Sequence, residues 1–280
     1  MNFILKNGSK GQETKRLQQK LGITADGVFG NGTEKAVKDF QAKNGLTADG
    51  VCGAETQRKL GMEVVPGIDV SGNNGSIDWV KVGKTDKKFA FIKLTEGRDF
   101  KSKVAKENWD GAKANGLLVG GYHFAKPSTQ PGEDDPIAEA SFFVKQLLAM
   151  GWKKGVDLLP VLDLEDGTKT DDEYNAHWAV SFCETVEKQL GVKPIVYTGK
   201  WFWDAYLAGA KKETLDKLTQ YQVWWAHYTT DFDNDPNIRG WTSWLLWQWT
   251  GSGSCDGITG KVDLDWLCGG EEGLRKIRGV

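Results

Sequence analysis

Beyond residue 66, the chain alternates short runs of β-branched and aromatic residues with stretches of helical pattern. This alternation predicts an α/β fold, because each strand of a parallel sheet needs a crossover connection to reach the next one. Eight runs are candidate strands: Gly67–Ser71, Phe89–Thr95, Leu118–Ala125, Leu158–Glu165, Pro194–Thr198, Gln222–Tyr228, Ser243–Thr250 and Val262–Trp266.

Helical patterns separate the early runs but not the last ones. Glu139–Met150 and Glu173–Leu190 read as helices, whereas the last three candidate strands follow one another with little room for a helix. Eight strands with incomplete helical cover predict an irregular eight-stranded β/α barrel over residues 65–280. In such a barrel the loops at the C-terminal ends of the strands form the functional site.

The first 64 residues contain an internal repeat. The sequence ThrAlaAspGlyVal occurs at Thr24–Val28 and again at Thr47–Val51. In each copy an Asp-Gly turn precedes a helix that we expect a threonine to open as its N-cap, over Thr33–Asn44 and Thr56–Leu60. A further helix is predicted at Gln12–Leu21 from the spacing of its leucines. Residues 1–64 therefore read as a small three-helix domain.

Charge and cysteine content exclude several classes of function. The formal net charge is −2, with +3 in residues 1–66 and −5 in the rest, so neither nucleic acid nor an anionic membrane is expected as the main partner. No apolar stretch is long enough to insert into a membrane. The four cysteines lack metal-binding spacing and are expected to be free thiols, with Cys255 and Cys268 the one pair close enough to consider for a disulfide.

Acidic residues stand at the ends of several candidate strands. Asp163 and Glu165 are two residues apart, so a strand would direct both side chains to the same face with Cα atoms about 6.6 Å apart. Two carboxylates on a buried face are too costly to be packing residues, and their mutual repulsion separates their pKa values into a proton donor and an anion. Glycosidic bond cleavage needs this division of roles.

Two further acids are expected to join this pair. Asp69 lies in the first candidate strand and Asp263 in the last, and these strands are neighbours in a closed barrel. Asp265 has the same strand parity as Asp263, and physical reasoning alone does not separate the two.

Aromatic and amide side chains near the strand ends are candidates for holding a sugar. An aromatic ring can stack on the face of a pyranose, and an amide can hydrogen-bond an acetamido group. We expect this binding role for Tyr122, Tyr197, Trp224, Tyr228 and Gln248.

The three histidines do not form a pattern that predicts a metal site. His177 lies in a predicted helix, and His123 and His227 have the wrong parity to face the cavity with Tyr122 and Tyr228. We therefore expect no metal and no cofactor, with the histidines hydrogen-bonded in the barrel wall. The segment Lys126–Pro136 is expected to be a loop on the catalytic face.

The residues after position 66 resemble glycoside hydrolase family 25, the Chalaropsis-type lysozymes. The resemblance is carried, in order and at strand ends, by Gly67–Ser71, Phe91–Glu96, Gly121–Phe124, Leu162–Glu165, Val196–Thr198, Trp224–Tyr228, Trp247–Gln248 and Val262–Asp265. Residues 9–60 resemble the type 1 peptidoglycan-binding domain, through a Leu-Gln helix, D-G-x-x-G loops and the pair Phe40–Gln41.

This resemblance implies cleavage of the β-1,4 bond between N-acetylmuramic acid and N-acetylglucosamine in bacterial peptidoglycan. It implies that Glu165 is the general acid and that Asp163 stabilises positive charge at the sugar, directly or through the substrate's N-acetyl group. Asp69 would be a supporting acid, and the resemblance favours Asp263 over Asp265 as the other.

The resemblance also implies a biological setting. The first residues contain too short an apolar run for a signal peptide. Together with the resemblance, this implies a phage endolysin that is made in the host cytoplasm and released to the wall through a holin pore. We expect it to be a monomer. The alternatives are a wall amidase or peptidase, disfavoured by the scarcity of histidine, and a non-catalytic wall-binding protein, disfavoured by the acid pair.

Overall fold

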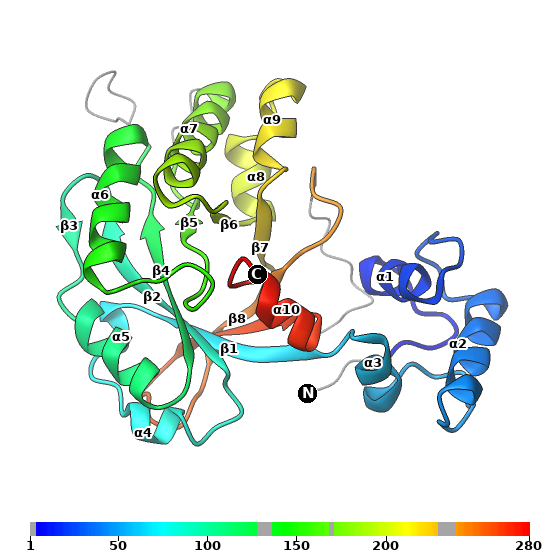
Figure 1. Ribbon diagram of the computed structural model, residues 1–280. Helices are drawn as coiled ribbons and strands as arrows, with labels where there is room; N and C mark the ends of the chain where they lie inside the picture. The colour runs from blue at the N-terminus through cyan, green and yellow to red at the C-terminus, as the bar shows by residue number, and fades with distance from the viewer. Residues whose placement is uncertain (1–3, 128–135, 168–170, 229–238) are drawn as a thin grey trace. The chain divides into compact units, whose positions relative to one another are not determined.

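The computed structural model describes residues 4–127, 136–167, 171–228 and 239–280 (Figure 1). These residues form two compact units. The first contains residues 4–65 and Cys268–Leu274, and the second contains Pro66–Tyr228, residues 239–267 and Arg275–Val280. The predicted boundary between residues 64 and 65 stays a prediction, and most of the loop expected at Lys126–Pro136 lies outside the described residues.

The N-terminal unit contains the three helices that the sequence predicts. They are α1 (Gln12–Leu21), α2 (Asn31–Lys43) and α3 (Ala54–Leu60). Leu17 and Val37 are buried among them. Phe29 and Cys52 occupy equivalent places in the two repeats, and both are fully buried.

Each repeat is organised around a buried glutamine. Gln18 Nε2 donates to Asp26, to the backbone carbonyl of Val28 and to Thr33, and Gln18 Oε1 accepts from the backbone N–H of Gly27. The second repeat has the same four bonds, with every partner 23 positions further along the chain: Gln41, Asp49, Val51, Thr56 and Gly50.

The prediction that threonine caps these helices is wrong. The N-caps are Gly30 and Gly53, which make no side-chain capping bond. Thr33 and Thr56 lie inside the first turn, where their hydroxyls accept the glutamine bonds instead. A tertiary hydrogen bond therefore takes the side chain that local propensity assigns to a cap.

The second unit contains the predicted eight-stranded barrel. In the sheet β1 lies beside β9, the order continues β9-β8-β7-β6-β5-β4-β2, and β2 pairs with β1 to close the ring. The barrel strands are β1 (Val64–Val70), β2 (Phe89–Glu96), β4 (Leu118–Phe124), β5 (Val161–Asp163), β6 (Ile195–Gly199), β7 (Gln222–Ala226), β8 (Leu246–Gly253) and β9 (Val262–Cys268). The two-residue strand β3 (Phe100–Lys101) pairs with β2 outside the ring.

Helices cover the barrel unevenly, as the sequence predicts. The helices of this unit are α4 (Trp79–Val82), α5 (Ala105–Ala114), α6 (Pro136–Ala149), α7 (Asp172–Leu190), α8 (Lys200–Tyr206) and α9 (Lys212–Leu218), and the last helix of the chain is α10 (Gly270–Lys276). Asp171 caps α7 by accepting from the backbone N–H of Tyr174. Between β7 and β9 the described residues contain no helix, and β9 runs antiparallel to β8.

Aromatic rings fill the barrel interior. Phe91 on β2 and Trp224 on β7 lie with ring centroids 4.8 Å apart, and Tyr197 on β6 meets Trp224 edge to face at 5.1 Å. The interior is therefore a packed core beneath a pocket at the C-terminal ends of the parallel strands.

Two further observations concern the cysteines and the helices. None of the four cysteines forms a disulfide, so Cys255 is not bonded to Cys268. Within the described residues, no helix has both the length and the apolar character needed to cross a bilayer.

Candidate active site

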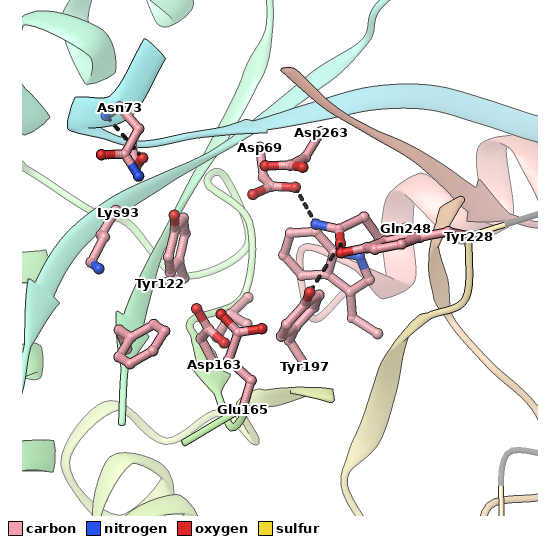
Figure 2. Close-up of a pocket in the computed structure, with 14 residues that line it drawn as sticks. Asp69, Asn73, Lys93, Tyr122, Asp163, Glu165, Tyr197, Tyr228, Gln248 and Asp263 are labelled. Carbon is pink, nitrogen blue, oxygen red and sulfur yellow. Dashed lines mark hydrogen bonds between the residues drawn. The ribbon is translucent and has the colours of Figure 1, made fainter. Parts of the chain in front are cut away.

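One pocket gathers all nine residues that the sequence predicts for the site (Figure 2). Its lining comprises Asp69, Ser71, Asn73, Lys93, Tyr122, Phe124, Val161, Asp163, Glu165, Tyr197, Trp224, Tyr228, Gln248 and Asp263. The strand register explains the convergence, because Asp163 pairs with Tyr197 and Tyr197 with Trp224 on three neighbouring parallel strands. The roles given to these residues stay predictions.

The paired carboxylates lie at the end of β5. Asp163 is its last residue and is buried, whereas Glu165 follows two residues later and is half-buried. Both side chains point into the pocket (Figure 2). Asp163 Oδ1 is buried and has no hydrogen-bond partner among the described residues. A buried acceptor without a donor is costly, which is typical of an atom that a ligand will satisfy.

The second acid pair comes from the first and the last strand of the barrel. Asp69 on β1 and Asp263 on β9 lie close together in the pocket (Figure 2). Because β9 is antiparallel to β8, its first residues lie at the end where the parallel strands finish, so Asp263 reaches the pocket.

Asp265 lies one pleat deeper than Asp263 and is not part of the pocket lining. It is buried, and its Oδ1 accepts a hydrogen bond from Trp224 Nε1 at 3.1 Å. Strand direction therefore separates two aspartates that parity leaves equivalent.

Burial raises the pKa values of all these acids. For Asp163, desolvation is the largest cause and the charge of Glu165 adds to it, so its pKa lies well above the usual range. The pKa of Glu165 is also raised by desolvation, with Lys93 opposing the shift. Desolvation likewise raises the pKa values of Asp69 and Asp263. The pocket therefore retains protons on its carboxyl groups at pH values where exposed acids have lost them.

A hydrogen-bond network links the aromatic residues to the acids (Figure 2). Tyr197 and Tyr228 both donate from their hydroxyls to Gln248 Oε1, at 2.9 and 3.1 Å. Gln248 Nε2 in turn donates to Asp69 Oδ2 at 2.8 Å, which lowers the pKa of Asp69 against the effect of burial. Gln248 thus positions protein groups within the site, a function that its sequence pattern does not indicate.

Lys93 is a functional candidate that the sequence reasoning did not single out. Among the described residues that line the pocket, it is the one with a positive charge. Its Nζ lies 2.6 Å from Glu96 and 4.5 Å from the ring centroid of Phe124. The sequence feature that could have identified it is its position two residues after Phe91 in one strand, which directs both side chains to the same face of the sheet.

The histidines lie in other surroundings. His123 is buried outside the barrel ring, 2.8 Å from Glu139 and 2.9 Å from Thr95, as expected for a wall residue. Desolvation lowers the pKa of His123. His177 lies on the exposed face of α7. Within the described part of the chain, no three His, Cys, Asp or Glu side chains are grouped to hold a metal ion.

Comparisons with known proteins give two family matches. Residues 68–258 match the model of "Glycosyl hydrolases family 25", and residues 10–60 match that of a "Putative peptidoglycan binding domain". "Uncharacterized protein YegX" of Escherichia coli O157:H7 is 34% identical over 216 residues, which cover 75% of this chain and 72% of the relative. Lysozyme M1 of Streptomyces globisporus is 29% identical over 206 residues, covering 71% and 66%.

A solved structure extends the likeness to the fold. The bacterial lysozyme from Streptomyces coelicolor superposes with a TM-score of 0.66 at 25% identity, covering 78% of this chain and 98% of that one. Since the first family model spans more than half of the sequence, the chain belongs to glycosyl hydrolases family 25 and is a glycoside hydrolase with an N-terminal domain of the peptidoglycan-binding type.

Proposed function

We propose that this enzyme is an N-acetylmuramidase that cleaves the β-1,4 bond between N-acetylmuramic acid and N-acetylglucosamine. The observation that carries the proposal is the pairing of Asp163, which has a buried oxygen without a donor, with Glu165 in one acidic pocket. Lysozyme M1, a relative, is named for this class of activity.

Glu165 is the proposed general acid. Desolvation raises the pKa of its carboxyl group, which favours the protonated form that gives a proton to the leaving oxygen. Asp163 is proposed to accept a hydrogen bond from the N–H of the substrate's acetamido group through its unpartnered Oδ1, which directs the acetamido oxygen at the anomeric carbon. Asp69 and Asp263 are proposed to set the charge of the site.

The aromatic lining is proposed to hold the sugar. Tyr122, Tyr197, Trp224 and Tyr228 present rings or hydroxyls to the pocket. Tyr197 and Tyr228 already bond Gln248, so their orientation is fixed before substrate arrives. The remaining N–H of the Gln248 amide is the group proposed to meet an acetamido oxygen.

The decisive experiment analyses the products of digestion of purified peptidoglycan. We expect new reducing ends that borohydride reduction identifies as N-acetylmuramic acid, and no new amino groups. New amino groups would indicate an amidase or peptidase, reducing-end N-acetylglucosamine a glucosaminidase, and no products a binding protein.

Residues 1–64 are proposed to hold the enzyme on the wall. A tethered barrel experiences a higher local concentration of its insoluble substrate without any change in chemistry. We expect the full chain with Glu165→Gln to sediment with peptidoglycan and the same variant lacking residues 1–64 to remain in the supernatant. Equal sedimentation of the two would refute the binding role.

The biological setting proposed is lysis of a bacterial host by a phage endolysin. A wall-degrading barrel joined to a wall-binding domain suits this task. Expression inside a bacterial host, with and without a co-expressed holin, tests it. We expect lysis only with the holin, and lysis without it would show that the enzyme reaches the wall by another route.

A further inference from the structure

Two exposed aromatic side chains stand at the rim of the barrel, beside the pocket. Trp201 is 45% exposed and Tyr228 is 59% exposed, and their ring centroids lie 6.4 Å apart. Trp201 follows β6 and Tyr228 follows β7, which are neighbouring parallel strands. Both rings therefore lie at the C-terminal ends of the strands, on the face that carries the acids.

The position of Trp201 depends on a glycine. The indole ring lies against Gly199, the last residue of β6, and a Cβ at that position would overlap the ring. Gly199 has an extended backbone, so its lack of a side chain serves contact rather than a turn. The absence of a Cβ lets a large apolar ring lie close against the strand end while nearly half of it faces solvent.

Tyr228 connects this rim to the pocket. Its hydroxyl donates to Gln248, which binds Asp69, while its ring faces Trp201. Gly251 packs against both Tyr228 and Asp263. A Cβ on Gly251 would lie 3.4 Å from the Tyr228 hydroxyl and 3.1 Å from Asp263 Oδ1, so a glycine leaves space for these two side chains. Tyr228 thus links the hydrogen-bonded network around Asp69 to the exposed ring of Trp201.

The chemistry of this rim favours an uncharged ligand with flat apolar faces. Lys200 and Asp204, which lie beside Trp201 in α8, form an ion pair at 2.6 Å, and Asp204 also binds Arg239, so within the described residues these charges are already paired. Exposed Trp and Tyr rings beside a binding pocket are typical of ligand contact, and their faces suit the C–H faces of a pyranose better than the charged groups of a peptide stem.

We propose that Trp201 and Tyr228 form a second sugar-binding subsite, which holds a further pyranose of the β-1,4-linked N-acetylated strand outside the catalytic pocket. This inference rests on the proposed muramidase function. A linear glycan longer than the pocket must leave it over the rim, and the aromatic pair lies on one such exit. The subsite makes the enzyme selective for long strands.

The test compares peptide-free glycan fragments of different length, with the full chain throughout. We expect Trp201→Ala to lower kcat/KM on octasaccharide about tenfold relative to the shortest fragment that the parent cleaves, as loss of an aromatic anchor does in other interfaces. Trp201→Phe keeps a ring and should recover most of this loss. Leu148→Ala, an exposed apolar change on α6, is the control and should leave the ratio unchanged.

Binding without turnover provides a second measurement. In a Glu165→Gln background, calorimetric titration with octasaccharide should give a Kd about tenfold weaker once Trp201 is changed to Ala. Equal length dependence and equal Kd values in the two proteins would overturn the subsite while leaving the muramidase assignment intact. Failure of the parent to cleave fragments of any length would overturn the proposed function itself.

Discussion

Gln248 Nε2 donates a 2.8 Å hydrogen bond to Asp69 Oδ2 although 179 residues separate the two along the chain. The bond ties β8 to β1 across the intervening strand β9. It also favours the ionised form of Asp69, whose pKa burial and the charge of Asp263 otherwise raise. Gln248 is therefore predicted to be a positioning residue that sets the charge of the acid cluster.

Replacing Gln248 with Met removes the donor and keeps the side-chain length. We expect the pKa of Asp69 to rise further, because the hydrogen bond that lowers it is lost. Carboxyl ¹³C NMR titration measures the change. Tyr197→Phe is the control, since it removes a donor to Gln248 Oε1 and leaves the bond to Asp69 in place. An unchanged Asp69 titration in the Met variant would contradict this role.

Glu165→Gln and Asp163→Asn are expected to reduce turnover comparably. The first removes the proton that the leaving oxygen needs, an effect of about 10²–10⁴-fold. The second removes the acidic carboxyl group that is proposed to orient the acetamido group. Digestion rates on walls measure both, with thermal unfolding of each variant as the control for folding of the barrel. A Glu165→Gln variant within threefold of the parent would exclude Glu165 as the acid.

The configuration of the first product tests the role of Asp163. If the acetamido oxygen attacks the anomeric carbon, the configuration is retained and the first anomer formed is β. NMR of a soluble glycan fragment during the first minutes of reaction follows it. An initial α-anomer would mean inversion, and Asp163 would then be the base that activates water.

Lys93→Met is expected to shift the pH–activity profile upward. Lys93 lowers the pKa values of both Asp163 and Glu165, so its removal raises both. The profile of kcat/KM against pH reports these pKa values in the free enzyme. Lys126→Met is the matched control, because the charge of Lys126 lowers the pKa of Glu165 less than the charge of Lys93 does. A larger shift in that variant would point to Lys126 as the controlling cation.

Asp265→Asn is expected to stabilise the protein at neutral pH. Desolvation raises the folded-state pKa of Asp265 well above its value in the unfolded chain, so the folded state binds more protons and its stability falls as pH rises between the two values. The variant avoids this penalty and its Oδ1 can still accept from Trp224. Its Tm should exceed that of the parent at pH 7, and the difference should vanish below about pH 4, where both states are protonated. A gain independent of pH would refute the ionic cause.

Gln18→Leu and Gln41→Leu are each expected to destabilise the N-terminal unit by about 2–4 kcal/mol. Each change removes four hydrogen bonds from buried groups, at roughly 1 kcal/mol per bond. Calorimetry of the full chain measures the loss. Gln19→Leu, an exposed change on α1, is the control. Activity on soluble fragments should stay unchanged, because the fragments do not need the wall-binding domain.

The sequence by itself predicted the eight barrel strands, the three N-terminal helices and nine residues of the pocket. The eight short apolar runs predicted all eight barrel strands, because a run of this length and pattern has few conformations other than a buried strand. The exact repeat at Thr24–Val28 and Thr47–Val51 predicted two equivalent turns, since identical residues meet identical local constraints. The nine predicted side chains converge because the register sets them on one face at one end.

Only the tertiary structure decided what depends on strand direction and on distant partners. The antiparallel course of β9 brings Asp263 to the pocket and leaves Asp265 beneath it, although both have the same parity. Thr33 binds Gln18 rather than capping a helix, because its partner lies on another helix. Lys93 faces the acids only once β2 lies in the closed ring. Periodicity constrains the face of a side chain, whereas its neighbours are set by which strands close upon one another.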